Sequence, residues 1–259
     1  MIGPPGTGKT NFIRQQVVKW CGEGYSPNDF VLSSLTRAAA AELRGRVDVP
    51  SNQVATLHSL CFRGLGAPPI AETKELRAEW NEEAIGKGML AWTIPKDRVD
   101  DEIEEEGAGL RLADYNLWRT TGRLNPMLEE KTKEFALAWE DFKLRTQSMD
   151  FTDLLEKGLV ELASCPGDPA ILMVDEAQDL TPLQWDLIHQ WGAHVERVVI
   201  AGDPAQAIYG FIGAGPEELL APIPTEHYRL LGRSYRLPSG VQSYAERWLG
   251  QHSGDLCNA

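Results

Sequence analysis

Short apolar runs alternate along this chain with longer helix-favouring stretches. Residues 30–34 predict a short buried strand, 54–55 a second brief one, and 170–174 and 197–201 are continuous apolar runs. The last two are typical of parallel strands that are covered on both faces. Strands that alternate with helices predict an α/β fold of three layers around a parallel sheet.

The helix-favouring stretches fall into two groups. Residues 9–20, 37–47 and 182–191 predict helices between the strands, and Thr36 opens the second of them. From residue 64 to residue 127 the pattern changes to charged, tryptophan-bearing segments broken by proline and glycine. We interpret 64–127 as a helical subdomain inserted into an α/β core that comprises 1–63 and 128–230.

Composition indicates an ordinary globular protein. The chain has 259 residues, of which 42% are hydrophobic and 24% charged, as in soluble domains. Apolar runs stay far below the roughly 18 residues that cross a membrane, and a signal-peptide pattern is absent, so we expect a cytoplasmic protein without a membrane partner. The cysteines are widely spaced, which argues against a metal site or disulfide framework and suits a reducing cytosol. They are Cys21, Cys61, Cys165 and Cys257.

The charge is unevenly distributed. A net charge of −13 gives no support to an electrostatic nucleic-acid binder. Residues 71–107 alone carry 12 acidic and 5 basic side chains, a net of −7. We interpret the acidic run 100–106 as a solvated surface, and a basic groove elsewhere stays open.

The chain begins with a complete phosphate-binding loop of the pattern G-x-x-x-x-G-K-[ST]. It consists of Gly3, Pro4, Pro5, Gly6, Thr7, Gly8, Lys9 and Thr10. In such a loop successive backbone N–H groups surround a polyphosphate, the lysine reaches the β- and γ-phosphates, and the threonine hydroxyl can hold Mg²⁺. The N-terminus of the following helix favours the same anion.

Only Met1 and Ile2 precede the loop, although this motif normally leaves a buried strand of roughly 4–8 residues. We therefore expect that the natural reading frame begins upstream. On this hypothesis the present chain binds ATP weakly and unfolds easily. Micromolar nucleotide affinity and a sharp cooperative melt would show instead that Met1 is a workable start.

Acidic and amide side chains follow the two later strands. Asp175 and Glu176 come directly after 170–174, where ligands sit in open α/β sheets. Asp175 suits the Mg²⁺ shell, and Glu176 suits the group that orients and deprotonates the attacking water. Gln206 follows the next strand and could sense the γ-phosphate, although Gly202-Asp203-Pro204 is also ordinary turn chemistry.

Seven segments together resemble the superfamily 1 DNA helicases of the UvrD/Rep type, and they occur in that family's order. They are residues 3–10 (motif I), 35–39 (Ia), 56–60 (Ib), 150–155 (the segment before motif II), 174–179 (II), 202–211 (III) and 234–236 (IV). The resemblance implies a RecA-like motor domain that hydrolyses Mg-ATP in response to single-stranded DNA. Residues 231–259 would then begin a second motor domain that is truncated.

The resemblance also implies roles for individual residues. Tyr235 would lie beside the adenine, and Arg236 would be an arginine finger to the γ-phosphate, where the alternative is a surface ion pair. Gln178 and Gln206 would couple the phosphate state to DNA. The implied catalytic residues are Lys9, Glu176, Gln206 and Arg236, with Thr10 and Asp175 at the metal. The implied DNA contacts are Thr36, His58, Tyr209 and Phe211.

Two of these DNA contacts have alternatives in ordinary structure. Tyr209 and Phe211 would offer rings on which bases stack, whereas the spacing alone favours core packing. His58 beside an apolar helix is more often structural. The chain also departs from the family's pattern: Leu35 replaces an aromatic residue, Ile212 an arginine, and Ser234 an asparagine.

Three functions remain open at this point. The first is the motor domain of a helicase or translocase. The family's segment before motif I and its motifs V and VI are missing, so a second RecA-like domain from a separate chain is a possible partner. The second is a regulatory module that binds nucleotide or DNA without unwinding. The third is an unrelated P-loop enzyme such as a nucleotide kinase, which the Asp175–Asp179 segment and residues 202–211 both disfavour.

Overall fold

The computed structural model describes residues 1–86, 91, 108–121, 130–217, 219–220, 227, 229–232 and 234–256. The chain forms two compact units. The first consists of Met1–Leu57, Gly167–Leu180 and Trp191–Ala259, and the second of His58–Pro166 and Thr181–Gln190. The boundaries of these units differ from those of the predicted domains, so the predicted division into domains stays a prediction.

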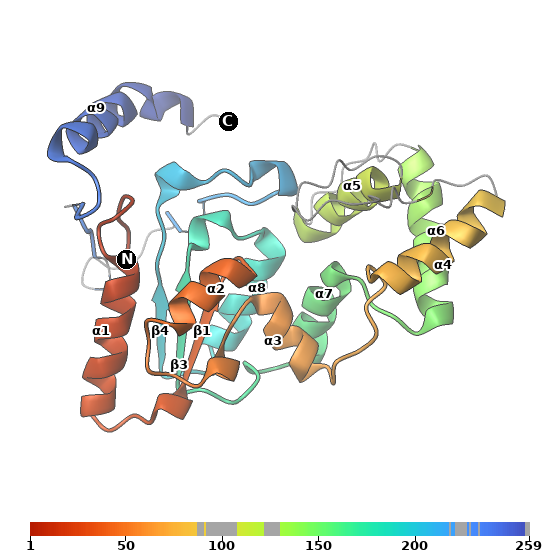
Figure 1. The fold of residues 1–259 in the computed structure, drawn as a ribbon, viewed down its shortest axis with the longest axis horizontal. Coiled ribbons are helices and arrows are strands. Elements are labelled where there is room, and N and C mark those ends of the chain that lie inside the picture. The colour runs from red at the N-terminus through yellow and green to blue at the C-terminus, as the bar shows by residue number, and fades with distance from the viewer. Residues whose placement is uncertain are drawn as a thin grey trace. The chain divides into compact units, whose positions relative to one another are not determined.

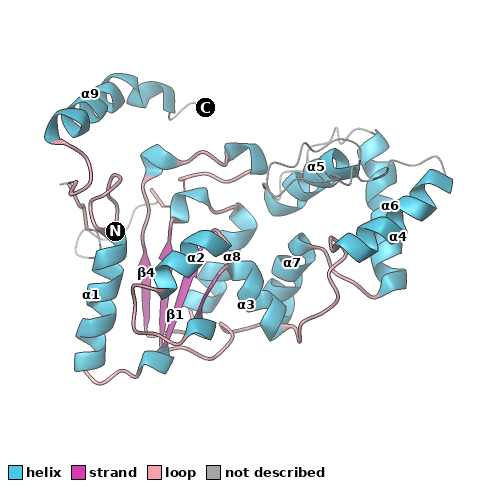
Figure 2. Cartoon of the chain, in the orientation of Figure 1, coloured by secondary structure: helices cyan, strands magenta, loops and turns pink. Residues whose placement is uncertain are grey.

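A parallel sheet organises the first unit (Figures 1 and 2). Its strands are β1 (Phe30–Ser34), β2 (Val54–Ala55), β3 (Ile171–Asp175) and β4 (Arg197–Ile200), in the order β2-β1-β3-β4. All neighbours pair in parallel. The predicted α/β class with a parallel sheet is confirmed, and each strand lies within one residue of its predicted range.

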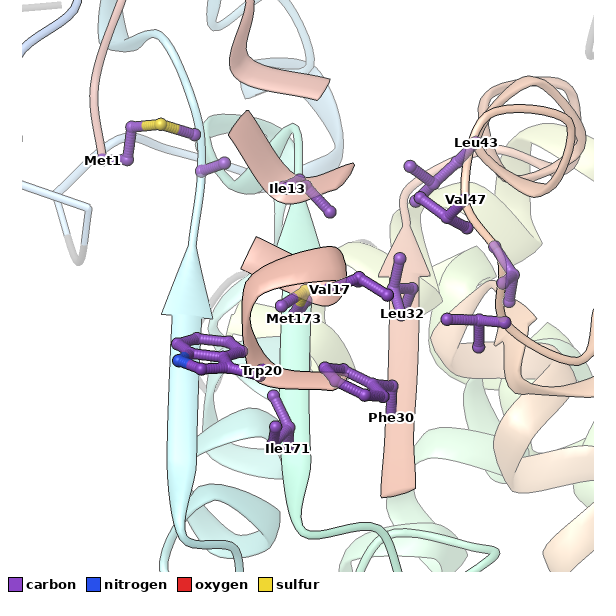
Figure 3. Packing of buried hydrophobic residues seen from close by; sticks show 13 residues of the cluster. Met1, Ile13, Val17, Trp20, Phe30, Leu32, Leu43, Val47, Ile171 and Met173 are labelled. Atoms are coloured by element: carbon purple, nitrogen blue, oxygen red, sulfur yellow. The ribbon is translucent and has the colours of Figure 1, made fainter. Parts of the chain in front are cut away.

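The core of this unit lies between the sheet and α1 (Lys9–Gly22). Ile13, Val17 and Trp20 of α1 pack toward Phe30 and Met173 of β1 and β3 (Figure 3). The ring of Phe30 is fully buried, and its truncation to alanine would cost about 3–5 kcal/mol. This packing holds α1, and with it the loop that precedes α1, at the ends of the strands.

The second helix of this unit, α2 (Arg37–Arg44), begins at an N-cap. The Thr36 Oγ1 accepts the backbone N–H of Ala39 at 3.1 Å, which satisfies one of the free donors of the first turn. The helix was expected to reach residue 47 but ends at Arg44, because Gly45 follows and glycine has a low helix propensity.

One strand differs from expectation. The residues of β3 are buried throughout, as predicted for a strand covered on both faces. In β4 the first two residues are exposed and the next two half-buried, with Val198 42% exposed. The prediction of full cover was therefore wrong for β4, which is the last strand of the described sheet.

The first residues of the chain extend the sheet. Ile2 forms parallel bridges to Gly202 on one side and to Leu230 on the other. The terminal amine of Met1 donates to the Ile200 carbonyl at 2.7 Å, and the Ile2 carbonyl accepts the N–H of Leu231 at 2.9 Å. The phosphate-binding loop thus leaves a short segment that is bonded on both sides.

Helices make up the second unit. They are α3 (Leu57–Gly64), which enters it from the first unit, α4 (Lys74–Gly86), α5 (Ala108–Thr121), α6 (Glu130–Thr146), α7 (Phe151–Glu161) and α8 (Pro182–Gly192). The Trp80 ring meets Phe135, Trp139 and Phe142 edge-on, with centroids 5.2–5.5 Å apart. The acidic run 100–106, like 87–90, 92–99 and 122–129 of the chain, lies outside the described residues.

A buried ionic network joins α5, α6 and α7. The Arg119 guanidinium donates to Asp150 at 2.8 Å, to Asp153 and Glu156 at 2.5 Å each, and is 3% exposed. The Lys143 ammonium donates to Asp150 at 2.9 Å and to Asp153 at 2.7 Å. Burial raises the pKa of Asp150, but the two cations outweigh burial and hold that pKa below its usual value. The two cations thus offset most of the negative charge of the three carboxylates.

A last helix, α9 (Ser239–Leu256), follows the sheet. Across the parts of the chain that the structure describes, no helix combines the length and the apolar character needed to cross a membrane.

Candidate active site

The phosphate-binding loop has a backbone that only glycine adopts readily. Gly6 and Gly8 have φ angles of 73° and 89°, in the left-handed region that side chains disfavour. Space is also limiting, because a Cβ at Gly6 would lie 2.8 Å from the Ser234 hydroxyl. At Gly3 a Cβ would lie 2.6 Å from the Thr7 hydroxyl. The loop is therefore built for close approach of backbone to a ligand.

Lys9 and Thr7 bond to the loop itself. The Lys9 ammonium is buried and donates to the Gly3 carbonyl at 2.8 Å. The Thr7 hydroxyl donates to the Pro4 carbonyl at 2.8 Å. The cation of the loop is thus held against the loop's first carbonyl, within the segment where a polyphosphate needs positive charge.

Thr10 and Asp175 come together from opposite ends of the sequence. The Thr10 hydroxyl at the start of α1 donates to the Asp175 carboxylate at the end of β3, across 3.4 Å. Burial, and then the charge of Glu176, raises the pKa of Asp175 to about 6. A hydroxyl and a carboxylate beside a phosphate loop are the oxygen ligands that Mg²⁺ takes together with water and phosphate oxygens. The pair therefore fits the predicted metal position.

Glu176 has an unusual backbone. Its φ and ψ are 56° and 42°, a left-handed conformation that costs a non-glycine residue of order 1–3 kcal/mol. Its backbone N–H donates to the Asp175 carboxylate at 3.1 Å. The turn brings two neighbouring carboxylates, Asp175 and Glu176, to the same end of β3.

Gln178 connects the acid pair with the loop after β4. Its amide nitrogen donates to Glu176 at 3.1 Å and to Asp179 at 2.9 Å. Its oxygen accepts the backbone N–H of Asp203 at 2.9 Å. Glycine is required at residue 202, because a Cβ there would lie 2.8 Å from the Gln178 oxygen. Gln178 is 2% exposed, so this amide is a buried bridge between two loops.

Gln206 and the two aromatic residues belong to that second loop. The Gln206 amide donates to the Asp203 carboxylate at 2.5 Å, so Asp203 holds both glutamines. The rings of Tyr209 and Phe211 have centroids 5.9 Å apart. Phe211 is 74% exposed, which excludes core packing as the reason for its ring.

Residues 234–236 lie against the phosphate-binding loop. The Ser234 hydroxyl donates to the Pro5 carbonyl at 2.9 Å, and the Tyr235 N–H donates to the Gly6 carbonyl at 2.8 Å. The side chains of Tyr235 and Arg236 are exposed. The structure thus brings both residues to the loop by their backbone.

The other two predicted DNA contacts have structural roles. Thr36 is the N-cap of α2, and His58 belongs to the second compact unit. The His58 ring meets the Phe151 ring edge-on with centroids 6.2 Å apart. Burial lowers the pKa of His58 to about 4, so its imidazole is neutral near pH 7.

Two acidic residues of the motifs, Asp179 and Asp203, have no role assigned from the sequence. Asp179 accepts the backbone N–H of Ile208 at 3.2 Å and so holds the start of the aromatic loop. Burial raises the pKa of Asp179. Asp203 caps the turn Pro204–Gln206 through the N–H of Ala205. The Asp-Pro turn was the visible signal for Asp203, whereas Asp179 had none beyond its place in the motif.

The parallel sheet and the glycine loop at its strand ends define a P-loop nucleotide-binding domain of RecA-like type. Residues 1–224 match the UvrD/REP helicase N-terminal domain. The chain belongs to this family, which confirms the resemblance.

Similarity to individual DNA helicases agrees with this family assignment. Over its whole length the chain is 28% identical to the ATP-dependent DNA helicase UvrD2 of Mycobacterium tuberculosis (strain ATCC 25618 / H37Rv). It is 24% identical, over 83% of its length, to the ATP-dependent DNA helicase srs2 of Schizosaccharomyces pombe (strain 972 / ATCC 24843). The chain spans 42% of that UvrD2 and 28% of that srs2.

Proposed function

We propose that this chain is the first motor domain of an ATP-dependent DNA helicase or translocase, and that it hydrolyses Mg-ATP in response to single-stranded DNA. The observation that carries the proposal is the meeting of Thr10 with Asp175 at 3.4 Å. A phosphate loop alone is found in many kinds of enzyme. A phosphate loop together with the acid pair and the Gln178 bridge is what a DNA-coupled ATPase needs.

Each residue of the proposed site has its own role in hydrolysis. The loop backbone and Lys9 bind and orient the phosphates, and Thr10 and Asp175 would hold Mg²⁺. A bound Mg²⁺ would shield the phosphate oxygens and make the γ-phosphorus more open to attack. Glu176 orients the attacking water and accepts its proton, and Arg236 stabilises the charge that develops on the transferred group.

DNA would act on this site through Gln178. Phe211 presents an exposed ring and Tyr209 a half-buried one for bases, and such stacking is worth about 1–3 kcal/mol per base. The loop that carries them is bonded to Asp179 and, through Asp203, to Gln178. A shift of the rings on DNA would thus move the amide that contacts Glu176. Thr36 in the first unit and His58 in the second are proposed as separate further DNA contacts.

We propose a second RecA-like domain, from a separate chain or from the same protein, as the partner that closes over ATP. The exposed side chain of Arg236 leaves room for such closure. The regulatory module and the nucleotide kinase remain the alternatives. A regulatory module would bind ATP without turnover, and a kinase would transfer the phosphate to a small acceptor.

Glu176→Gln tests the assignment most sharply. The change keeps the volume and one acceptor oxygen but removes the base, so turnover should fall at least about a hundredfold. Affinity for Mg-ATP should stay within about threefold. Glu42→Gln is the matched control, because Glu42 is an exposed carboxylate on α2 that pairs only with Arg46 among the described residues. Normal hydrolysis by Glu176→Gln would disprove the role of Glu176.

A further inference from the structure

One hydroxyl group of the first unit is buried without a hydrogen-bond partner. Ser34 is the last residue of β1 and is 3% exposed. Its Oγ has no hydrogen-bond partner among the described residues. A buried hydroxyl that has lost its bonds to water and gained none in the protein costs free energy. Few buried polar groups of native proteins are left in this state, so the Ser34 hydroxyl points to a ligand or ordered water that bonds to it.

Ser34 lies beside the proposed metal residues. In the parallel pairing of β1 with β3, Ser34 is in register with Asp175. The preceding pair on the same face, Leu32 and Met173, packs with α1 (Figure 3). Because side chains alternate along a strand, Ser34 and Asp175 also point toward the α1 face. The bond from Thr10, at the start of α1, to Asp175 agrees with this direction.

A hydroxyl in this position suits the water shell of a metal ion. Mg²⁺ gives up its waters reluctantly and usually keeps several of them beside protein and phosphate oxygens. Thr10 and Asp175 offer a hydroxyl and a carboxylate, so water ligands would occupy further positions. A serine oxygen accepts a hydrogen bond from such a water, while its own O–H can still donate. Groups that bond to the ligands of a metal orient them and raise the affinity for the metal.

We propose that Ser34 is a positioning residue of the Mg²⁺ site, whose Oγ accepts a hydrogen bond from a water ligand of the ion held by Thr10 and Asp175. This inference rests on the proposed function, which places Mg-ATP at the phosphate-binding loop. Ser34 acts on the nucleotide only through water and metal. Its removal should therefore weaken the binding of Mg²⁺ and leave the binding of metal-free nucleotide unchanged.

The test uses the whole chain and mant-AMPPNP, a fluorescent ATP analogue whose β–γ bridge is not hydrolysed. Its affinity is measured in EDTA and at rising Mg²⁺, which gives the Mg²⁺ concentration for half of the metal-dependent gain. In Ser34→Ala this concentration should rise about five- to tenfold, while the affinity in EDTA stays within about twofold. Ser33→Ala is the matched control and should change neither value, because it removes a buried hydroxyl that points to the opposite face of β1.

Thermal unfolding without metal and nucleotide gives a second readout. Ser34→Ala removes the unpaired hydroxyl, so the midpoint should rise by about 2–4 °C. A hydroxyl that only supports the fold would give the opposite sign. A lowered midpoint in Ser34→Ala, an unchanged Mg²⁺ requirement, or an equal rise of that requirement in Ser33→Ala would each overturn the proposal.

Asp175→Asn separates this proposal from the function on which it rests. The substitution should remove most of the Mg²⁺ dependence of mant-AMPPNP binding, because it replaces the carboxylate of the metal site. If Asp175→Asn loses this dependence and Ser34→Ala keeps it at the wild-type Mg²⁺ concentration, only the role of Ser34 fails. If binding to the wild-type chain does not depend on Mg²⁺, the proposed metal site fails as well.

Discussion

The side-chain oxygen of Gln178 accepts the backbone N–H of Asp203 across 2.9 Å, from one strand end of the sheet to the next. The same amide donates to Glu176. A single buried side chain therefore touches both the proposed water-activating acid and the loop that carries Tyr209 and Phe211. If DNA controls hydrolysis, Gln178 links the loop that would bind DNA directly to Glu176.

Removal of this bridge should uncouple DNA from hydrolysis. In Gln178→Ala the N–H of Asp203 and the Glu176 and Asp179 carboxylates each lose a partner. We expect stimulation of ATP turnover by single-stranded DNA to fall about tenfold, while the nucleotide Kd changes less than about threefold. Gln15→Ala, on the exposed face of α1, is the control. Full stimulation in Gln178→Ala would show that the coupling runs elsewhere.

Binding of Mg-ATP should depend on the protonation of Asp175. Because the pKa of Asp175 is raised to about 6, protons compete with Mg²⁺ as the pH falls through 6. The Mg²⁺-dependent part of the affinity should weaken about tenfold per pH unit below that value. Titrations between pH 5 and pH 8 measure this. Asp175→Asn controls for protonation of the phosphates, which both proteins experience; identical pH profiles would contradict the metal role of Asp175.

Glu72 should make stability depend on pH. Burial, then the charge of Asp150, raises the pKa of Glu72 to about 8, although its carboxylate accepts the N–H of Phe151 at 2.7 Å. The folded state then holds a proton that the unfolded state releases near pH 4.5, so the free energy of unfolding falls as pH rises from about 4.5 to 8. Glu72→Gln should remove this loss. Urea unfolding at pH 5 and pH 8 should show the variant gaining about 1–3 kcal/mol relative to wild type between them.

The ionic network should contribute strongly to the second unit. Arg119→Met leaves the carboxylates of Asp150, Asp153 and Glu156 with less positive charge, and breaking a buried pair costs about 3–5 kcal/mol. Arg145→Met removes a cation that also pairs with two carboxylates, but at the surface. We expect its denaturation midpoint to stay close to wild type. Equal losses in both variants would mean that burial of Arg119 does not matter.

The nucleotide half of the site was predictable from sequence for a physical reason. Gly6 and Gly8 allow the positive φ angles of the loop locally, so the loop can be recognised without reference to any distant residue. The strand ends were predictable as well. Asp175 follows an apolar run, and the parallel order places its carboxylate near the loop, as its bond to Thr10 confirms.

Contacts between distant segments were not predictable in this way. Arg119 looks like any helix-surface cation in sequence, and its carboxylate partners lie 31 to 37 positions away. The exposure of β4 was not predicted either. The composition of residues 197–201 indicates a covered strand, but it does not show which segments lie beside that strand. Pattern predicts the elements, whereas the partners of long side chains depend on how the elements pack.

Steady-state ATP hydrolysis by this chain, with and without single-stranded oligonucleotide, tests the central claim most directly. Lys9→Ala is the control, because Lys9 is the loop's cation and lies outside the proposed DNA path. We predict turnover that rises when the oligonucleotide is added and disappears in Lys9→Ala. Turnover that does not change when the oligonucleotide is added, or that persists in Lys9→Ala, would contradict a DNA-coupled ATP site in this domain.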